Sequence, residues 1–324
     1  MIDLHLHLDG SLTREELVIL ANMSGVSLIE AKNAHISVDE NCHSLNDYLK
    51  CFEFPLKVLQ KKECIEKAVY FLLSRLARSG LLYAEVRFAP QLHTKEGLTQ
   101  KEVVEAAISG LEKAKKDYAF PANLILCAMR GDKNEEENLL TVRLAKEYLH
   151  KGVCGLDLAG AEALYPTSMF KNVFKLANDL DVPFTIHAGE ASGPESVWEA
   201  LKMGARRIGH GVSAAKDKML LSFLASSGVT LELCPTSEKD THAIKSYEDL
   251  PIQTFLRYGV KVCLNTDDMT VSNITLQEEC EKVQKTFGLS DETMKELFLN
   301  SVEASFLDND QKDFLRDELE KKYR

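Results

Sequence analysis

The sequence predicts an α/β protein with the architecture of a (β/α)₈ TIM barrel, and three observations lead to this expectation. Short runs of apolar and β-branched residues alternate with longer segments of helical spacing along the whole chain. There are eight such runs, which is the number of strands in a closed barrel. No linker rich in proline or serine divides the 324 residues, so one barrel with insertions explains the length better than two domains.

Each expected strand is followed by a helical segment, which implies right-handed βαβ units around a parallel sheet. In chain order, the strands are expected at Ile2–His7, Leu82–Phe88, Asn123–Met129, Val153–Leu158, Pro183–His187, Arg207–Gly209, Val229–Cys234 and Val260–Thr266. The helices are expected at Thr13–Met23, Cys64–Ser79, Gln100–Tyr118, Glu135–His150, Ser168–Leu180, Pro194–Met203, Lys218–Ser226 and Leu250–Tyr258.

Local signals support the ends of these helices. Thr13 and Glu16 have the spacing of a capping box at the start of the first helix. A glycine follows several helices, as expected where the chain leaves a helix in a left-handed conformation. These glycines are Gly80, Gly152, Gly204, Gly228 and Gly259.

Two stretches exceed a minimal barrel. Residues 24–60 are expected to form a helical insertion after the first strand, and residues 276–322 are expected to form extra C-terminal helices. Residues 1–324 are expected to be a single domain. An open, doubly wound sheet is the alternative, but no G-x-G-x-x-G motif follows an early strand, so its usual dinucleotide site is missing.

Composition excludes several classes of partner. The net charge of −11 comes from 39 basic and 50 acidic residues without a basic cluster, so no nucleic-acid partner is expected. The longest apolar runs fall far short of the ~18–20 residues of a membrane span, and a polar cluster begins too soon after Met1 for a signal peptide. Eight cysteines without a C-x-x-C pair favour a reducing compartment, so a cytoplasmic protein is expected.

Residues that can bind a metal or transfer protons stand at the expected ends of four strands. His5 and His7 share one face of the first strand, because side chains two residues apart point the same way. The others are His187 and Glu190 after the fifth strand, His210 after the sixth, and Asp267 and Asp268 after the eighth. Since the carboxyl ends of barrel strands form the active-site face, these side chains are expected to meet there. The alternative is that these residues are ordinary polar residues at the rim of the barrel. The presence of such residues at the ends of four separate strands argues against it.

Other polar residues are expected to have structural roles only. Glu85 and Arg87 share a face of the second strand and are expected to form an internal ion pair. The remaining five histidines are expected at the surface or in loops, and they are His35, His43, His93, His150 and His242.

The types of ligand favour a single zinc ion. Three imidazoles and one carboxylate suit a borderline cation, and catalytic zinc keeps an open position for water. The P-C-x-x-C signature of cytosine-type zinc deaminases is absent, because Cys234-Pro235 has no second cysteine nearby. A second metal would usually need a bridging ligand, such as a lysine at the end of the fourth strand, which the sequence lacks.

Six motifs together resemble the adenosine deaminase family of the amidohydrolase superfamily, and they occur in the order of that family between residues 5 and 268. They are His5-x-His7-Leu8-Asp9-Gly10-Ser11, Asp157-Leu158-Ala159-Gly160, Ile186-His187-Ala188-Gly189-Glu190, Arg207-Ile208-Gly209-His210-Gly211, Cys234-Pro235-Thr236-Ser237 and Asn265-Thr266-Asp267-Asp268. The resemblance covers nearly the whole chain, and this combination of motifs is highly specific.

The resemblance implies a hydrolase of purine salvage that converts adenosine, and 2′-deoxyadenosine, to inosine and ammonia. It implies one Zn²⁺ per chain, with four ligands: His5, His7, His187 and Asp267. Glu190 would protonate purine N1, and His210 would orient or deprotonate the attacking water. Asp267 would thus act in catalysis as well as in metal binding.

The resemblance also implies how a purine nucleoside would be held. Asp268 would hydrogen-bond N7, the main-chain amide of Gly160 would bind N3, and Asp9 would bind the ribose 5′-hydroxyl. A carboxylate at Asp9 would repel a 5′-phosphate, so AMP is expected to be a very poor substrate. The alternative for Asp9 is that it caps the turn before Gly10.

The insertion after the first strand carries an apolar stripe at helical spacing. Leu45, Tyr48, Leu49 and Phe52 recur at i, i+3, i+4 and i+7. The resemblance makes this stripe a hydrophobic gate over the purine, a kind of lid that many buried active sites have. Ordinary core packing is the alternative.

Three positions depart from the usual pattern of the family. Glu238 and Met269 stand where members usually read C-P-T-S-N and T-D-D-P, and Ala161 stands where an acidic residue is common. A deaminase of adenine or of an N6-modified purine nucleotide is therefore kept as an alternative. A barrel that binds purine without turnover is a second one, although every catalytic position is intact.

Overall fold

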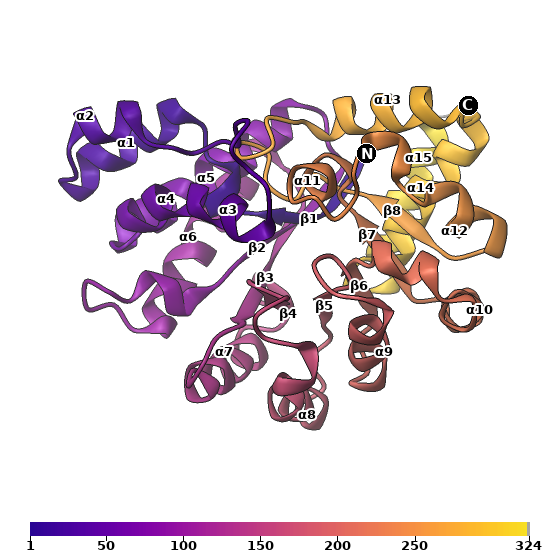
Figure 1. Cartoon of the computed structure of the whole chain (residues 1–324). Coiled ribbons are helices and arrows are strands. Elements are labelled where there is room, and N and C mark those ends of the chain that lie inside the picture. Colours follow the sequence, from indigo (N-terminus) through magenta and orange to yellow (C-terminus); the bar gives the residue numbers. More distant parts are fainter. Residues whose placement is uncertain (323–324) are drawn as a thin grey trace.

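The computed structural model describes residues 1–322 and confirms the predicted (β/α)₈ barrel, with the strands at the centre and the helices around them (Figure 1). Its strands are β1 (Ile2–His7), β2 (Tyr83–Phe88), β3 (Ala122–Met129), β4 (Val153–Ala159), β5 (Thr185–Ala188), β6 (Arg207–His210), β7 (Thr230–Leu233) and β8 (Val262–Leu264). All paired strands are parallel and form two four-stranded sheets, β1 to β4 and β5 to β8.

Short main-chain bridges close the barrel between the two sheets. At one seam, the His7 amide donates to the Asp267 carbonyl at 2.7 Å and the Asp267 amide donates to the His5 carbonyl at 2.8 Å. At the other seam, the Leu156 amide of β4 donates to the Pro183 carbonyl before β5 at 3.0 Å. The first of these seams runs directly through residues that the sequence predicts for the site.

The helices lie close to their predicted positions. They include α1 (Arg14–Ser24), α5 (Lys62–Arg78), α6 (Gln100–Tyr118), α7 (Glu135–Glu147), α8 (Lys171–Asp179), α9 (Pro194–Lys202), α10 (Lys218–Ser227), α11 (Pro235–Asp240) and α12 (Ile252–Tyr258). The capping box of Thr13 and Glu16 is present, and all five predicted cap glycines have positive φ angles.

Both stretches beyond the minimal barrel are helical. The insertion contains α2 (Leu28–Asn33), α3 (Leu45–Tyr48), the 3₁₀ helix η2 (Leu49–Phe52) and α4 (Glu53–Val58). The C-terminal part contains α13 (Leu276–Phe287), α14 (Asp291–Ala304) and α15 (Asn309–Lys322), and α14 packs against β8 and β1.

The interior of the barrel holds a buried ionic network, and its pairing differs from the prediction. Arg87 pairs with Asp157 at 2.9 Å and with Glu232 at 3.0 Å, whereas Glu85 pairs with Arg207 at 2.6 Å. The predicted ion pair between Glu85 and Arg87 is therefore wrong. The partners lie on β4, β6 and β7, which are not neighbours of β2, because inward-facing side chains meet across the interior of a closed barrel.

The prediction for the remaining histidines holds for four of the five. His35, His43, His150 and His242 are exposed. His93 is buried in the 3₁₀ helix η3 (Pro90–His93), where its Nδ1 lies 2.9 Å from the Leu59 carbonyl oxygen. The hydrogen bond to this carbonyl satisfies the ring inside the core, so the surface prediction for His93 is wrong.

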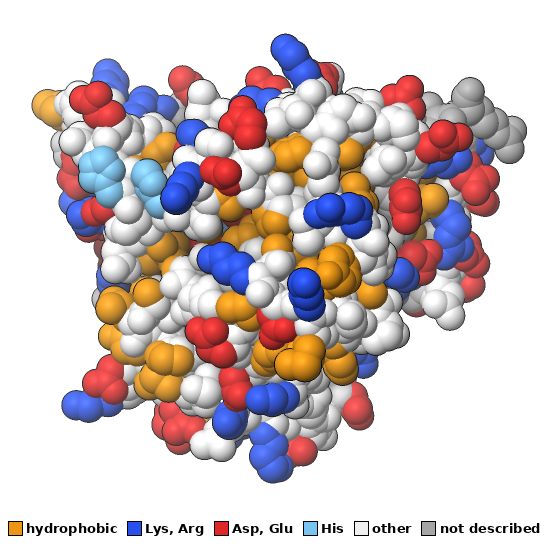
Figure 2. Space-filling model, turned by 45° about the vertical axis from the view of Figure 1, so that its right-hand side comes forward, with side chains coloured by type: hydrophobic (Ala, Val, Ile, Leu, Met, Phe, Trp, Pro, Cys, Tyr) orange, Lys and Arg blue, Asp and Glu red, His pale blue; other side chains and the backbone are white. Residues whose placement is uncertain are grey.

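The surface carries charges of both signs, and the cysteines are unpaired. Lys and Arg side chains are interspersed with acidic ones on the face shown in Figure 2. Within residues 1–322 no helix is long and apolar enough to cross a membrane. All eight cysteines lie in this range and are free thiols.

Candidate active site

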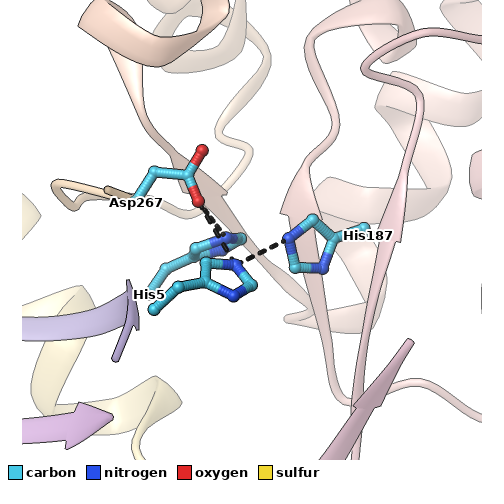
Figure 3. A group of neighbouring side chains, drawn as sticks. His5, His187 and Asp267 are labelled. Carbon is cyan, nitrogen blue, oxygen red and sulfur yellow. Dashed lines mark hydrogen bonds and ion pairs between the residues drawn. The ribbon is translucent and has the colours of Figure 1, made fainter. Parts of the chain in front are cut away.

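Four of the predicted side chains converge at the carboxyl ends of the strands. His5 and His7 come from β1, His187 from β5, and Asp267 from the turn after β8 (Figure 3). Asp267 Oδ1 lies 3.2 Å from His5 Nε2 and 3.3 Å from His7 Nε2, and the Nε2 atoms of His7 and His187 are 3.3 Å apart. One ligand atom from each residue lies within 4.8 Å of all the others.

The spacing of these atoms fits one small cation held by all four side chains. Bonds of about 2.0–2.1 Å from zinc to nitrogen or oxygen place neighbouring ligand atoms roughly 3.3 Å apart. His5 Nε2 is also buried without a hydrogen-bond partner among the described residues. Such an atom is expected where an ion supplies the missing partner. The donor set therefore fits a metal of the zinc type.

Two buried carboxylates orient the imidazoles. Glu232 Oε2 lies 2.7 Å from His5 Nδ1, and Asp157 Oδ2 lies 2.9 Å from His187 Nδ1. A carboxylate at Nδ1 keeps the proton on that nitrogen, so the lone pair of Nε2 points into the cluster. The arrangement is the one that metal-binding histidines usually have.

The turn after β8 holds Asp267 in a strained backbone conformation. The φ angle of Asp267 is +60°, in the left-handed region that side chains other than glycine rarely adopt. The Ser237 hydroxyl donates to Asp267 Oδ2 at 2.6 Å, which leaves Oδ1 directed at the histidines. His210, at the end of β6, has a similar φ of +61°.

His210 lies between carboxylates on both sides of its ring. Its Nε2 is 3.7 Å from Glu190 Oε2 and 3.9 Å from Asp267 Oδ2, and its Nδ1 is 3.5 Å from Glu238 Oε1. Burial alone would lower the pKa of His210, but the charges of Glu190, Glu238 and Asp267 outweigh it and raise the pKa to about 10. The Nε2 edge of the ring faces the cluster.

Glu190 provides a carboxyl group that favours its protonated form. It follows β5 and is only 8% exposed. Its Oε1 is buried and makes no hydrogen bond within the described part of the chain. Burial raises the pKa of Glu190, and His210 only partly offsets this effect. A protonated carboxyl beside the cluster can serve as a general acid.

These groups open into one cavity of about 300 Å³. His7, His187, Asp267, Glu190 and His210 line it, whereas His5 is fully buried behind them. All four predicted gate residues line the same cavity, and they are Leu45, Tyr48, Leu49 and Phe52. The insertion thus covers the site with apolar side chains, the kind of lining that favours a flat aromatic ligand.

The three predicted substrate-binding residues also line this cavity. Burial raises the pKa of Asp9 to about 6, and burial together with Asp267 and Asp9 raises the pKa of Asp268 well above its usual value. A side chain at Gly10 would lie 1.7 Å from Asp268 Oδ1, so only glycine permits this packing. Gly160 follows β4 directly and has a φ of +106°. The structure therefore brings every predicted site residue to one place.

Sequence reasoning missed several supporting residues. Glu232 is a charged residue in the apolar run of β7, and a lone charge inside a buried strand was the signal that could have singled it out. Glu162 accepts hydrogen bonds from the loop that carries Glu190, and Arg130 donates to the His187 carbonyl at 2.6 Å. No spacing in the sequence points to these two residues, since their partners are main-chain groups.

The three departures from the family pattern lie at or near the site. Ala161 lines the cavity, and Glu238 is fully buried behind His210. The sulfur atom of Met269 lies 3.6 Å from Arg75 Nη1. None of the three replaces a residue of the metal-binding cluster.

The fold and the cluster define a (β/α)₈ barrel with a candidate metal site at the carboxyl ends of its strands. The family model described as adenosine deaminase matches residues 1–322. An adenosine deaminase from Haemophilus ducreyi is 46% identical over 331 aligned positions, which cover 100% of this chain and 96% of that protein. The chain belongs to the adenosine deaminase family.

Solved structures with the same fold include deaminases of other purines. An adenine deaminase from Arthrobacter aurescens superimposes with a TM-score of 0.88 at 26% identity, covering 99% of this chain and 98% of that one. An N6-methyl-AMP deaminase from Arabidopsis thaliana gives a TM-score of 0.86 at 25% identity, covering 99% and 96%. The fold is therefore shared by proteins whose names give different 6-aminopurine substrates.

Proposed function

We propose that this chain is a zinc-dependent hydrolase that converts adenosine and 2′-deoxyadenosine, with water, to inosine or 2′-deoxyinosine and ammonia. The observation that carries the proposal is a four-ligand cluster beside a buried carboxyl group in an apolar cavity. Family membership and the full-length similarity to an adenosine deaminase support the same activity.

One zinc ion per chain would be held by His5, His7, His187 and Asp267. When bound, zinc would lower the pKa of a water molecule, so that the water can lose a proton near neutral pH and attack an electron-poor ring carbon. His210 faces the cluster with Nε2 and would orient that water by a hydrogen bond.

Glu190 would be the acid. Attack at C6 of a purine places negative charge on N1, and a proton delivered there removes the charge as it develops. Burial of Glu190 keeps that proton available. One proton of the attacking water would pass to the amine at C6, which leaves as ammonia, and the other would return to Glu190 as the C6 hydroxyl becomes a carbonyl.

The other residues of the cavity would hold the nucleoside. Asp268 would hydrogen-bond N7, the main-chain amide of Gly160 would bind N3, and Asp9 would accept a hydrogen bond from the ribose 5′-hydroxyl. All three line the cavity that contains Glu190. A flat purine would lie under the apolar gate formed by Leu45, Tyr48, Leu49 and Phe52.

The same proposal covers the organisation of the chain. Residues 1–324 would act as one catalytic domain, with residues 24–60 as the lid and residues 276–322 as supporting helices. The protein would act in the reducing cytoplasm, where thiols such as that of Cys42 stay free.

The experiment compares adenosine, 2′-deoxyadenosine, adenine, AMP and N6-methyl-AMP side by side on protein of known metal content. The two nucleosides should react fastest, and His187→Ala should lose both metal and activity, because three ligands hold the site less well. Faster turnover of adenine would favour an adenine deaminase, and faster turnover of AMP or N6-methyl-AMP would favour a nucleotide deaminase. Full metal occupancy with retained turnover in His187→Ala would refute the ligand assignment.

A further inference from the structure

One buried carboxylate, that of Glu162, accepts hydrogen bonds from the main chain of the loop that carries Glu190. Glu162 lies after β4 and is 1% exposed. Its Oε1 accepts a hydrogen bond from the Gly189 amide at 2.7 Å. Its Oε2 accepts from the amides of Glu190 at 3.1 Å, Ala191 at 2.7 Å and Ser192 at 3.1 Å. Four successive main-chain amides therefore converge on one side chain.

The same carboxylate belongs to a wider network of hydrogen bonds. The Ser196 hydroxyl donates to Glu162 Oε1 at 2.5 Å and shares a hydrogen bond of 2.7 Å with Thr167 Oγ1. Arg130 Nη2 donates to Thr167 Oγ1 at 2.9 Å and to the His187 carbonyl at 2.6 Å. The network thus reaches the main chain on both sides of the β5 carboxyl end.

The chemistry of this position requires a carboxylate. An ionised carboxylate only accepts hydrogen bonds and has about four acceptor sites, which matches a set of N–H and O–H donors. A glutamine there would turn an NH₂ group toward amides that also donate. The charge is favourable as well, because the amides lie just before α9, at the positive end of that helix.

We propose that Glu162 is a positioning residue for the deamination reaction, which fixes the main chain of residues 189–192 and so aims the Glu190 carboxyl at the purine ring. The inference rests on the proposed function. A displacement of about 1 Å in a reacting group can cost roughly 10²-fold in rate. Burial is the main cause that raises the pKa of Glu190, and the charge of Glu162 adds to it.

The test is Glu162→Gln, which keeps the shape of the side chain but removes its charge and two acceptor sites. We expect kcat for adenosine to fall about 10–100-fold, with KM changed less than about threefold, because ground-state binding depends on other residues. Metal content should be unchanged. Amide hydrogen exchange in residues 189–192 should accelerate, which reports the loosened loop independently of turnover.

Glu195→Gln is the matched control, because it makes the same change in an exposed glutamate that accepts the Gly193 amide, outside residues 189–192. Its kcat and the exchange of residues 189–192 should stay close to the parent values. A similar loss of kcat in Glu195→Gln would show a general effect on this segment and overturn the inference. Parent-like kcat and exchange in Glu162→Gln would overturn it too.

Two further variants keep the result decisive. If Glu162→Gln does not fold, Glu162→Asp takes its place: the shorter carboxylate should lower kcat at unchanged KM and metal content, and a parent-like kcat would refute the inference. Glu190→Gln in the same assay separates the two proposals. If Glu190→Gln is inactive while Glu162→Gln is normal, only the positioning role fails; if Glu190→Gln turns over normally, the proposed acid itself is wrong.

Discussion

Asp9 is the single residue that should decide between a nucleoside and a free base. It lines the cavity two residues after His7. If Asp9 binds the ribose 5′-hydroxyl, Asp9→Ala should lower kcat/KM for adenosine by ~1.5–3 kcal/mol, or roughly 10–150-fold. Steady-state assays on adenosine and adenine measure the difference.

Adenine serves as the internal control, because it has no ribose to lose. Its slow turnover should be largely unaffected in Asp9→Ala. An equal loss on both substrates would mean that Asp9 caps the turn before Gly10 or supports the cluster.

Glu190 should act as an acid rather than as a structural group. Glu190→Gln is nearly isosteric and should keep both metal and fold, but kcat should fall ~10²–10⁴-fold because the donor of the N1 proton is lost. Glu195→Gln, at an exposed position in the first turn of α9, is the control and should behave like the parent. A kcat for Glu190→Gln within about threefold of the parent would exclude the acid role.

The candidate site residues that the sequence could predict are metal-binding or acid–base residue types at a strand end. His5, His7, His187 and Asp267 follow a simple rule, since barrel strands present their carboxyl ends to one face. Glu162 obeys no such rule: its partners are main-chain amides of a distant loop. Only folding brings that carboxylate and that loop together.

A hydrogen bond of Tyr48 ties the part of the lid formed by α3 and η2 to the barrel. The Tyr48 hydroxyl shares a hydrogen bond of 2.9 Å with Ser272 Oγ in the segment after β8. Tyr48→Phe should loosen the lid by about 0.5–1.5 kcal/mol and so raise KM for adenosine roughly 2–12-fold with little change in kcat. Tyr70→Phe, which removes a hydroxyl bound to Asp117 on α6, is the control. If Tyr48→Phe and Tyr70→Phe have the same KM, Tyr48 does not hold the gate.

The contact between α13 and α11 should make stability depend on pH. Burial raises the pKa of Glu279 from its usual 4.5 to about 7, against the effect of hydrogen bonds from Thr236. The folded state therefore binds this proton more tightly than the unfolded chain does. The protonated Glu279 contributes up to about 3 kcal/mol to the free energy of unfolding. This contribution is fully present below about pH 4.5 and is lost as the pH rises through about 7.

Glu279→Gln should remove that part of the pH dependence, since an amide can both accept from the Thr236 amide and donate to its hydroxyl. Urea unfolding between pH 5 and 8 measures the slope. The exposed Glu281→Gln on the same helix should retain the parent slope. An unchanged slope in Glu279→Gln would show that Glu279 titrates at its ordinary value.

At the scale of elements, hydrophobic periodicity predicted the order and type of nearly every strand and helix, but not their ends. The predicted strand Val260–Thr266 is confined to Val262–Leu264, because the chain then turns to place Asp267 in a left-handed conformation. The predicted helix from Ser168 begins as a 3₁₀ turn, Thr167–Phe170, and becomes an α-helix at Lys171. Such boundaries depend on tertiary contacts at the site and in the loops, which hydrophobic periodicity does not report.

For the whole molecule, the candidate metal site lies across a seam where the barrel closes. His5 and His7 belong to the first sheet, His187 belongs to the second, and Asp267 lies in the turn after β8. At this seam a short main-chain bridge joins β1 to the turn after β8. A metal ion that links the four side chains would therefore stabilise closure as well as serve catalysis.

Removal of the metal with a chelator should accordingly lower the stability of the entire barrel. A ligand that binds only the folded state adds about 2.7 kcal/mol when its free concentration is 100 times Kd, so the melting temperature should fall by several degrees and recover with added Zn²⁺. The amides of His7 and Asp267, which close the seam, should exchange faster in the metal-free protein. His187→Ala is the control: having lost one ligand, it should melt at nearly the same temperature with and without chelator. If the parent protein also melts at one temperature in both conditions, the cluster does not hold a stabilising metal, and the ligand assignment is wrong.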